Sequence, residues 1–187
     1  MFSSAVARRR LLALAGGLAG GVHLATSDQQ CASAFASAPQ EPTLHKRWED
    51  GWNAGRYSNA GTGFHKADVN PHLKKFQSLL LGSASGSHVL VPLCGKSVDL
   101  VHLAEHGCDV VGVEGVSRAL DEFAAEQQFT AQSAVVGPFT VRSFHPRIKI
   151  CHGDFFKLVQ SVAGEFDAVW DRASLVAIDP STRQQCA

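Results

Sequence analysis

Short apolar segments bounded by turn residues recur from residue 88 onward and predict buried β-strands. Each segment is four to seven residues long and rich in β-branched or aromatic residues, which suits strands better than helices. Helical patterns separate the segments, and this alternation indicates right-handed βαβ units and a parallel sheet. The four predicted strands are residues 88–93, 108–114, 148–151 and 166–170.

Residues 70–82 carry the clearest helical pattern. Asn70 is a favoured N-cap residue, Pro71 suits the first helical position, and Gly82 ends the pattern. The apolar stripe between them consists of Leu73, Phe76, Leu79 and Leu80. Further helices are predicted from Ser97 to His106, from Ser117 (as the cap) to Gln128, from Asp154 and from Leu175, whereas residues 129–147 are expected to be irregular.

Two tryptophans precede this alternating region. Trp48 and Trp52 are four positions apart, so they share one face if the segment is helical. Such a pair either anchors a helix in the core or offers aromatic faces to a ligand. A loop rich in glycine follows from Gly55 to Gly63.

The charge balance separates the N-terminal segment from the rest of the chain. The whole chain of 187 residues has 17 Lys and Arg against 17 Asp and Glu, and 45% of its residues are apolar, as in globular proteins. Residues 1–38 contain three arginines and one aspartate, so residues 39–187 have a net charge of −2. A neutral to acidic chain lacks the basic field that general nucleic-acid binding requires, and we expect no nucleic-acid partner.

Residues 1–38 have the composition of a targeting leader (signal or transit peptide). Arg8–Arg10 precede an apolar stretch from Leu11 to Ala25, which is too short to span a bilayer comfortably, so no stable membrane span is expected. Ala32-Ser33-Ala34-Phe35-Ala36 resembles the cleavage site of plastid precursors in algae with complex plastids. We therefore favour a plastid; the alternatives are a secretory signal, a mitochondrial presequence, or a disordered tail on a cytoplasmic protein.

Metal and disulfide chemistry find little support in the sequence. The five cysteines include no C-x-x-C pair, which argues against a zinc finger or a disulfide framework. His102-Leu103-Ala104-Glu105-His106 matches H-x-x-E-H, but a polar helix face with histidines near its C-terminus explains the pattern better than a zinc protease. No metal site is therefore expected.

The turn after the first predicted strand points to a nucleoside-like ligand. In open α/β sheets ligands lie beyond the carboxyl ends of the strands, and here the turn is Pro92-Leu93-Cys94-Gly95-Lys96-Ser97. Its single glycine disfavours a diphosphate, which needs close backbone approach at several glycines. Glu114 ends the second strand, 19 residues after Gly95, where an acid typically accepts ribose hydroxyls. S-adenosylmethionine meets this description; the alternative is that Glu114 is a solvated acid at a strand end.

The loop after the third predicted strand lies at the same edge of the sheet. Gly153-Asp154-Phe155-Phe156 would approach the adenine of such a ligand. Alternatively, Asp154 only caps the next helix.

These segments together resemble the thiopurine S-methyltransferase family of class I S-adenosylmethionine-dependent enzymes. The similar features follow the family's order over residues 45–186, and the Pro-Leu-Cys-Gly-Lys turn with the Trp-Asp-Arg segment is the most specific pair. The segments are Trp48–Trp52, Phe64-His65, Val69–Pro71, Val91–Ser97, Val110–Glu114, Gly153–Phe156 and Trp170–Ile178.

The resemblance implies an α/β fold, a Rossmann-like class I methyltransferase sheet, with a methyltransferase domain over residues 39–187. The family's sheet has seven strands and four are predicted here, so we expect the N-terminal part of that domain, truncated after about four parallel strands. The cofactor would contact Trp48, Trp52, Leu93, Gly95, Glu114, Gly153, Asp154 and Arg172. Phe64 and Arg172 would face the substrate, and no residue would act as a covalent catalyst.

The activity that the resemblance implies is methyl transfer from S-adenosyl-L-methionine to the sulfur of a small thiol, by a monomer. Alternatives are a halide or thiocyanate methyltransferase and a cofactor-binding fragment without turnover. For Arg172, a surface position or an ion pair with Asp171 remains an alternative to a site role.

Overall fold

The computed structural model describes residues 44–58, 64–82 and 86–186. The chain divides into two units, Met1–Gln40 and Glu41–Ala187, and all described residues belong to the second. The predicted leader, residues 1–38, lies outside the described residues and stays a prediction. Among the residues that the structure describes, no helix is long and apolar enough to cross a bilayer.

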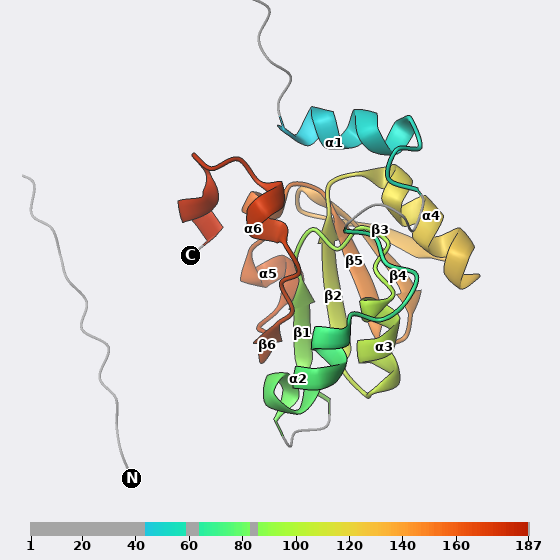
Figure 1. Cartoon of the computed structure of the whole chain (residues 1–187), viewed down its shortest axis with the longest axis vertical. Helices are drawn as coiled ribbons and strands as arrows, with labels where there is room; N and C mark the ends of the chain where they lie inside the picture. Colours follow the sequence, from blue (N-terminus) through green and yellow to red (C-terminus); the bar gives the residue numbers. More distant parts are fainter. Residues whose placement is uncertain (1–43, 59–63, 83–85, 187) are drawn as a thin grey trace, which may run out of the picture. The chain divides into compact units, whose positions relative to one another are not determined.

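A six-stranded mixed sheet forms the centre of the second unit (Figure 1), with the order β3-β4-β5-β2-β1-β6. Four parallel strands match the segments predicted from sequence: β1 (His88–Val91), β2 (Asp109–Glu114), β5 (Ile148–His152) and β6 (Ala168–Val169). The fourth is shorter than predicted. Val89 pairs with Val110 and with Ala168, so β1 lies between β2 and β6.

The expectation that residues 129–147 are irregular was wrong. They contain β3 (Gln132–Val136) and β4 (Phe139–His145), an antiparallel hairpin joined to the edge of β5. Because β4 pairs antiparallel with both β3 and β5, the sheet is mixed rather than wholly parallel. The turn between β3 and β4 uses Gly137, whose φ of 56° glycine adopts without the strain that a side chain would bring.

The helices form close to where their sequence patterns predict. Asn70 caps α2 by accepting a hydrogen bond from the His72 amide at 2.9 Å. Two predicted starts were misplaced: α3 begins at Asp99 rather than Ser97, and Val116 rather than Ser117 is the N-cap of α4. The α-helices are α1 (Leu44–Asn53), α2 (Pro71–Leu81), α3 (Asp99–Glu105), α4 (Ser117–Gln127), α5 (Gln160–Ala163) and α6 (Ser174–Ala177). The 3-10 helices are η1 (Phe155–Lys157) and η2 (Arg183–Cys186).

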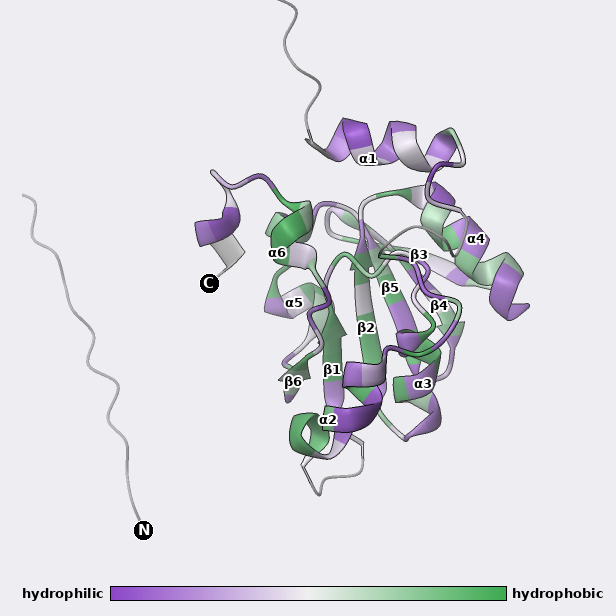
Figure 2. Ribbon diagram, viewed as in Figure 1, coloured by the Kyte–Doolittle hydropathy of each residue, from purple (hydrophilic) through white to green (hydrophobic). Residues whose placement is uncertain are grey.

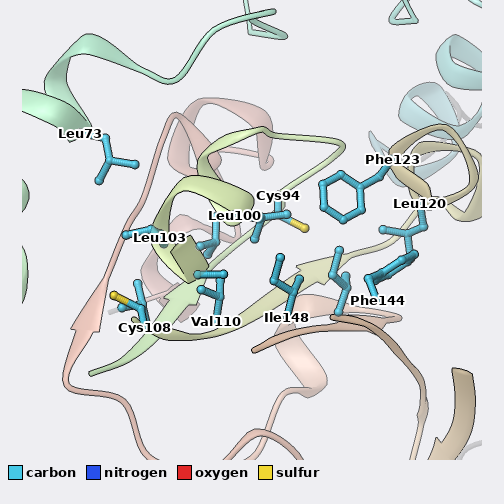
Figure 3. Packing of buried hydrophobic residues seen from close by; sticks show 14 residues of the cluster. Leu73, Cys94, Leu100, Leu103, Cys108, Val110, Leu120, Phe123, Phe144 and Ile148 are labelled. Carbon is cyan, nitrogen blue, oxygen red and sulfur yellow. The ribbon is translucent and has the colours of Figure 1, made fainter. Parts of the chain in front are cut away.

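Helices cover both faces of the central part of the sheet, and the central strands β1 and β2 are correspondingly apolar (Figure 2). On one face, Leu100 and Leu103 of α3 and Phe123 of α4 pack on the sheet (Figure 3). On the other face, η1 and α5 cover Val111 and Val113 of β2. Because both faces are packed, β1 and β2 are held rigidly, and the turns at their carboxyl ends are well placed to position a site.

Candidate functional site

The turn from β1 to α3 has a tightly curled backbone. Leu93 and Gly95 both adopt positive φ values, 44° and 54°. A leucine in this region is strained and persists only where its surroundings hold it there, as happens at ligand sites. The amide of Cys94 donates to the Val113 carbonyl at 3.0 Å, which folds the turn back onto the end of β2.

Glu114 joins this turn to the turn after β2. Its carboxylate accepts hydrogen bonds from the amides of Gly95, at 2.9 Å, and Val116, at 2.8 Å. The residue is only 7% exposed, so it is not a solvated acid at a strand end. Burial raises the pKa of Glu114, and the bonds from the two amides partly offset that rise. Glu114 therefore places a fixed carboxylate at the carboxyl edge of the sheet.

Four aromatic side chains form a wall beside these turns. Trp48 and Trp52 of α1 do share one face, and α1 lies beyond the carboxyl ends of β1 and β2 (Figure 1). The ring of Phe64 lies 5.4 Å from that of Trp48 and 5.1 Å from that of Tyr57, edge to face. The indole nitrogen of Trp48 donates to the Ala177 carbonyl at 3.0 Å, which ties α1 to α6. In this edge-to-face packing the edge of one ring meets the face of the next, an arrangement that aromatic pairs favour.

A cavity of about 230 Å³ lies between the turns and the aromatic wall. It brings together most of the site residues predicted from sequence: Trp48, Trp52, Phe64, Leu93, Gly95, Glu114 and Arg172. Because these residues come from segments far apart in the chain, their convergence is a property of the fold.

Gly153 and Asp154 do not line this cavity, unlike the other predicted site residues. Asp154 is exposed and caps η1, accepting from the Phe156 amide at 3.0 Å. A Cβ atom on Gly153 would come within 2.6 Å of the Phe139 ring, so packing against the hairpin explains the glycine. The Gly153 amide still donates to the Glu114 carbonyl at 3.0 Å.

Arg172 is held through a different carboxylate from the one that sequence suggested. Its Nε atom lies 4.0 Å from Oδ2 of Asp99, which is 2% exposed and also accepts from the Trp170 indole at 2.9 Å. Asp171 instead accepts two hydrogen bonds from Ser174, at the start of α6. Arg172 therefore faces the cavity with its orientation set by a buried acid.

Several lining residues were not among the predicted site residues. His65, which is 7% exposed, directly follows Phe64, and Lys96 directly follows Gly95. Their positions next to predicted site residues were the signal in the sequence that could have identified them. Burial, and then the neighbouring Lys96 charge, lower the pKa of His65. The others are His45, Cys94, Ser97, Gly115, Val116, Ala173, Ser174, Val176 and Ala177.

Lys96 is a buried cation beside the aromatic wall. Its ammonium group donates to Glu122 at 2.9 Å, to Glu126 and to the carbonyl of Ser58 at 2.7 Å, and its side chain is 1% exposed. Burial alone would lower the pKa of Lys96, but the two carboxylates outweigh burial and raise it. The lysine therefore stays charged.

The H-x-x-E-H segment takes part in ordinary helix contacts. His102 bonds Gln77 at 2.7 Å, and Nδ1 of His106 lies 2.7 Å from the His102 carbonyl. Among the described residues, no group of three or more His, Cys, Asp or Glu side chains is arranged to hold a metal ion.

A solved structure of similar fold supports the architecture. Magnesium protoporphyrin IX methyltransferase from Synechocystis PCC 6803, solved with bound SAM, superposes with a TM-score of 0.54 at 16% identity. The superposition covers 79% of this chain and 70% of that structure. At this identity the likeness concerns the fold alone: a class I methyltransferase sheet.

Proteins related by sequence share a higher identity with this chain than the solved structure does. A thiopurine S-methyltransferase from Pseudomonas fluorescens (strain Pf-5) is 39% identical over 140 residues, covering 75% of this chain and 60% of its own length. One from Azotobacter vinelandii is 41% identical over 139 residues, covering 74% and 62%. The chain thus spans about three fifths of the length of these relatives.

The family model for thiopurine S-methyltransferase matches residues 45–187, which include every residue that lines the cavity. The match also covers the strained β1–α3 turn and the Glu114 carboxylate that bonds to it. The chain therefore belongs to the thiopurine S-methyltransferase family.

Proposed function

We propose that the cavity binds S-adenosylmethionine and that the chain serves methyl transfer to the sulfur of a small thiol. The observation that carries this proposal is the position of Glu114: a buried carboxylate at the end of β2, fixed by two backbone amides and facing a cavity with an aromatic wall. Family membership supports the same activity.

The residues present fit such a cofactor. Each Glu114 oxygen accepts one amide bond and keeps a lone pair for a ribose hydroxyl. The Leu93–Gly95 turn offers no glycine-rich cradle for a diphosphate, and the cofactor has none. Trp48, Trp52 and Phe64 would face its sulfonium, since aromatic faces attract cations. Gly153 and Asp154 stay as proposed contacts for the adenine end, beyond the cavity.

The bound cofactor would supply an electrophilic methyl group, so the protein needs no covalent nucleophile. The cavity lining includes the thiol of Cys94, and burial followed by the nearby Glu114 charge raises its pKa well above the usual value. Cys94 therefore stays protonated and unreactive near neutral pH. The work of the chain is to hold both reactants in line and to keep water away.

Arg172 is the residue best placed to act on the acceptor. A guanidinium group beside a thiol favours its anionic form, which is the better nucleophile. Asp99 keeps this group at the cavity rather than in solvent, because Asp99 is itself anchored by the Asn70 amide at 2.8 Å and by Trp170. We therefore assign to Arg172 the stabilisation of a substrate thiolate.

Calorimetry with S-adenosylhomocysteine, the demethylated cofactor, tests the binding site. We expect Glu114→Ala to weaken binding by roughly ten- to a hundredfold, the usual loss for hydrogen bonds to a charged group. Glu105→Ala removes an exposed carboxylate at the end of α3 and serves as the matched control. Unchanged affinity in a folded Glu114→Ala protein would overturn the ribose assignment.

Methyl-transfer assays on small thiols, with iodide and thiocyanate as competing acceptors, test the reaction. We expect thiols to be preferred and Arg172→Met to lower kcat/KM for them, because the substrate thiolate loses the cation beside it. Preference for halide would favour the halide-type alternative. Binding without turnover on any acceptor would favour the binding-only alternative for these 187 residues.

A further inference from the structure

The buried Lys96 ammonium is the feature of the cavity wall that the proposed function leaves unused. Lys96 lines the cavity, and its ammonium nitrogen lies 6.0 Å from the centre of the Trp52 ring. The same ring belongs to the wall that would face the cofactor. A fixed positive charge therefore stands beside a site proposed for a positively charged ligand.

Two carboxylates of α4 form ion pairs with the Lys96 ammonium group. Glu122 and Glu126 both accept hydrogen bonds from Lys96. Because they are one helical turn apart, both carboxylates approach the ammonium group from the same face of α4. Glu122 also accepts from the Ser58 hydroxyl at 2.6 Å and from Arg118 at 2.8 Å. Counted together with Arg118, the group is electrically balanced, with two cations and two anions.

We propose that Glu122 and Glu126 determine the charge specificity of the cavity, neutralising Lys96 so that a sulfonium cation is accepted beside it. The inference rests on the proposed function, because it concerns the cationic form of the same cofactor. Without one of the carboxylates, the Lys96 charge would repel the sulfonium and leave the neutral thioether product favoured.

The geometry places the charge of this group at the cavity, because Lys96 lines it and lies 6.0 Å from the centre of the Trp52 ring. His65 lines the cavity, and the pKa of its ring is lowered by burial and by Lys96, whereas Glu126 and Glu122 act in the opposite sense. Lys96 is almost completely buried, so salt and water screen its charge less than they would at the surface. A change in the charge balance around Lys96 should therefore change the electrostatic potential at a ligand in the cavity.

The matched ligands for a test are S-adenosylmethionine and S-adenosylhomocysteine, which differ by one methyl group and one positive charge. Calorimetry on the full chain gives the ratio of their two dissociation constants. We expect Glu126→Gln to shift this ratio against the sulfonium by roughly three- to tenfold, as a unit charge several ångströms away would do. Glu126 is the cleaner position, because Glu122 also holds Ser58 and Arg118.

A second variant predicts the opposite sign. Lys96→Met removes the cation and leaves the carboxylates, so the ratio should shift toward the sulfonium. Asp121→Asn is the control: it also removes a carboxylate from α4 and uncovers a cation, but its partner Arg142 does not line the cavity. Its ratio should stay within a factor of about two of the parent's.

The outcomes separate the two proposals. If neither ligand binds the parent chain, the proposed function fails and this inference fails with it. If both bind and the ratio is the same in Glu126→Gln as in the parent, with folding verified by circular dichroism, the charge-specificity inference is overturned while the proposed function stands.

Discussion

Glu122 illustrates how one side chain gains its properties from its neighbours. Partial burial would raise the pKa of Glu122, but bonds from Ser58, Arg118 and Lys96 outweigh burial and lower it from 4.5 to about 2. A carboxylate with a lowered pKa stabilises the folded state above its unfolded pKa, and that contribution is lost as the pH falls through the folded value. Glu122 therefore favours the folded state at neutral pH and ceases to do so in acid.

This gives a prediction for acid unfolding. Between pH 4.5 and about 2 the parent should lose thermal stability more steeply than Glu122→Gln, which has no proton to gain at this position. Melting temperatures from circular dichroism across that range would show the difference. Parallel curves for the two proteins would contradict it.

Gly95 contributes to the site through its backbone rather than through a side chain. With φ at 54°, alanine at this position should cost about 1 kcal/mol of stability and displace the amide that donates to Glu114. We expect Gly95→Ala to lower both the free energy of unfolding and the affinity for S-adenosylhomocysteine, measured by urea unfolding and calorimetry.

Gly164 provides the matched control for that substitution. Its φ of 83° and ψ of −161° lie in a region that essentially only glycine occupies, so Gly164→Ala should strain the backbone at least as much as Gly95→Ala. A Cβ atom there would meet nothing within 4 Å, so the substitution adds no site contact. It should lose stability and keep its affinity. Equal losses of affinity in both variants would show that the Gly95 effect is not local to the site.

Among the elements, α2 is the one that sequence specified most completely. Asn70 supplies the cap, and its own amide donates to Asp99, the acid that orients Arg172. Asn70→Ala should reduce the free energy of unfolding by about 1 kcal/mol, the usual worth of an N-cap side chain. Asn70→Asp keeps the acceptor and should remain close to the parent in the same urea titration; a loss as large as that of Asn70→Ala would argue against capping.

The hairpin was missed for an identifiable reason. Every residue of β3 is exposed, so no apolar alternation marks the strand. In β4 the pairing register shifts between Ser143 and His145, which breaks the two-residue period. The hairpin is specified by contacts with distant residues instead: Arg142 bonds to Asp121 and Ser117 of α4.

The central strands and most of the cavity could be predicted because their signals are local. A buried strand end, a turn, a helix, a second strand and a strand-end acid follow one another between Val91 and Glu114. The charge group around Lys96 could not be predicted, since it needs α4 to pack against the β1–α3 turn. The pairing of Arg172 with Asp99 likewise joins residues that are far apart in the chain.

For the whole molecule, we propose that residues 1–38 contain a leader that is cleaved within the Ala-Ser-Ala-Phe segment. The basic start, the apolar stretch and the Ala-Ser-Ala-Phe segment predict a mature chain that begins near Phe35 in a plastid. Mass spectrometry of the N-terminal peptide of the natural protein would test this. A mature protein that retains Arg8–Arg10 would contradict it, and cleavage elsewhere would favour a secretory or mitochondrial address.

The tryptophans of this chain have an optical consequence. There are three, and Trp48 and Trp52 line the cavity while Trp170 bonds to Asp99, the partner of Arg172. Indole emission responds to the polarity and hydrogen bonding around the ring. The intrinsic fluorescence of the protein therefore originates beside the cavity, and filling that cavity should alter its colour and intensity without any added label.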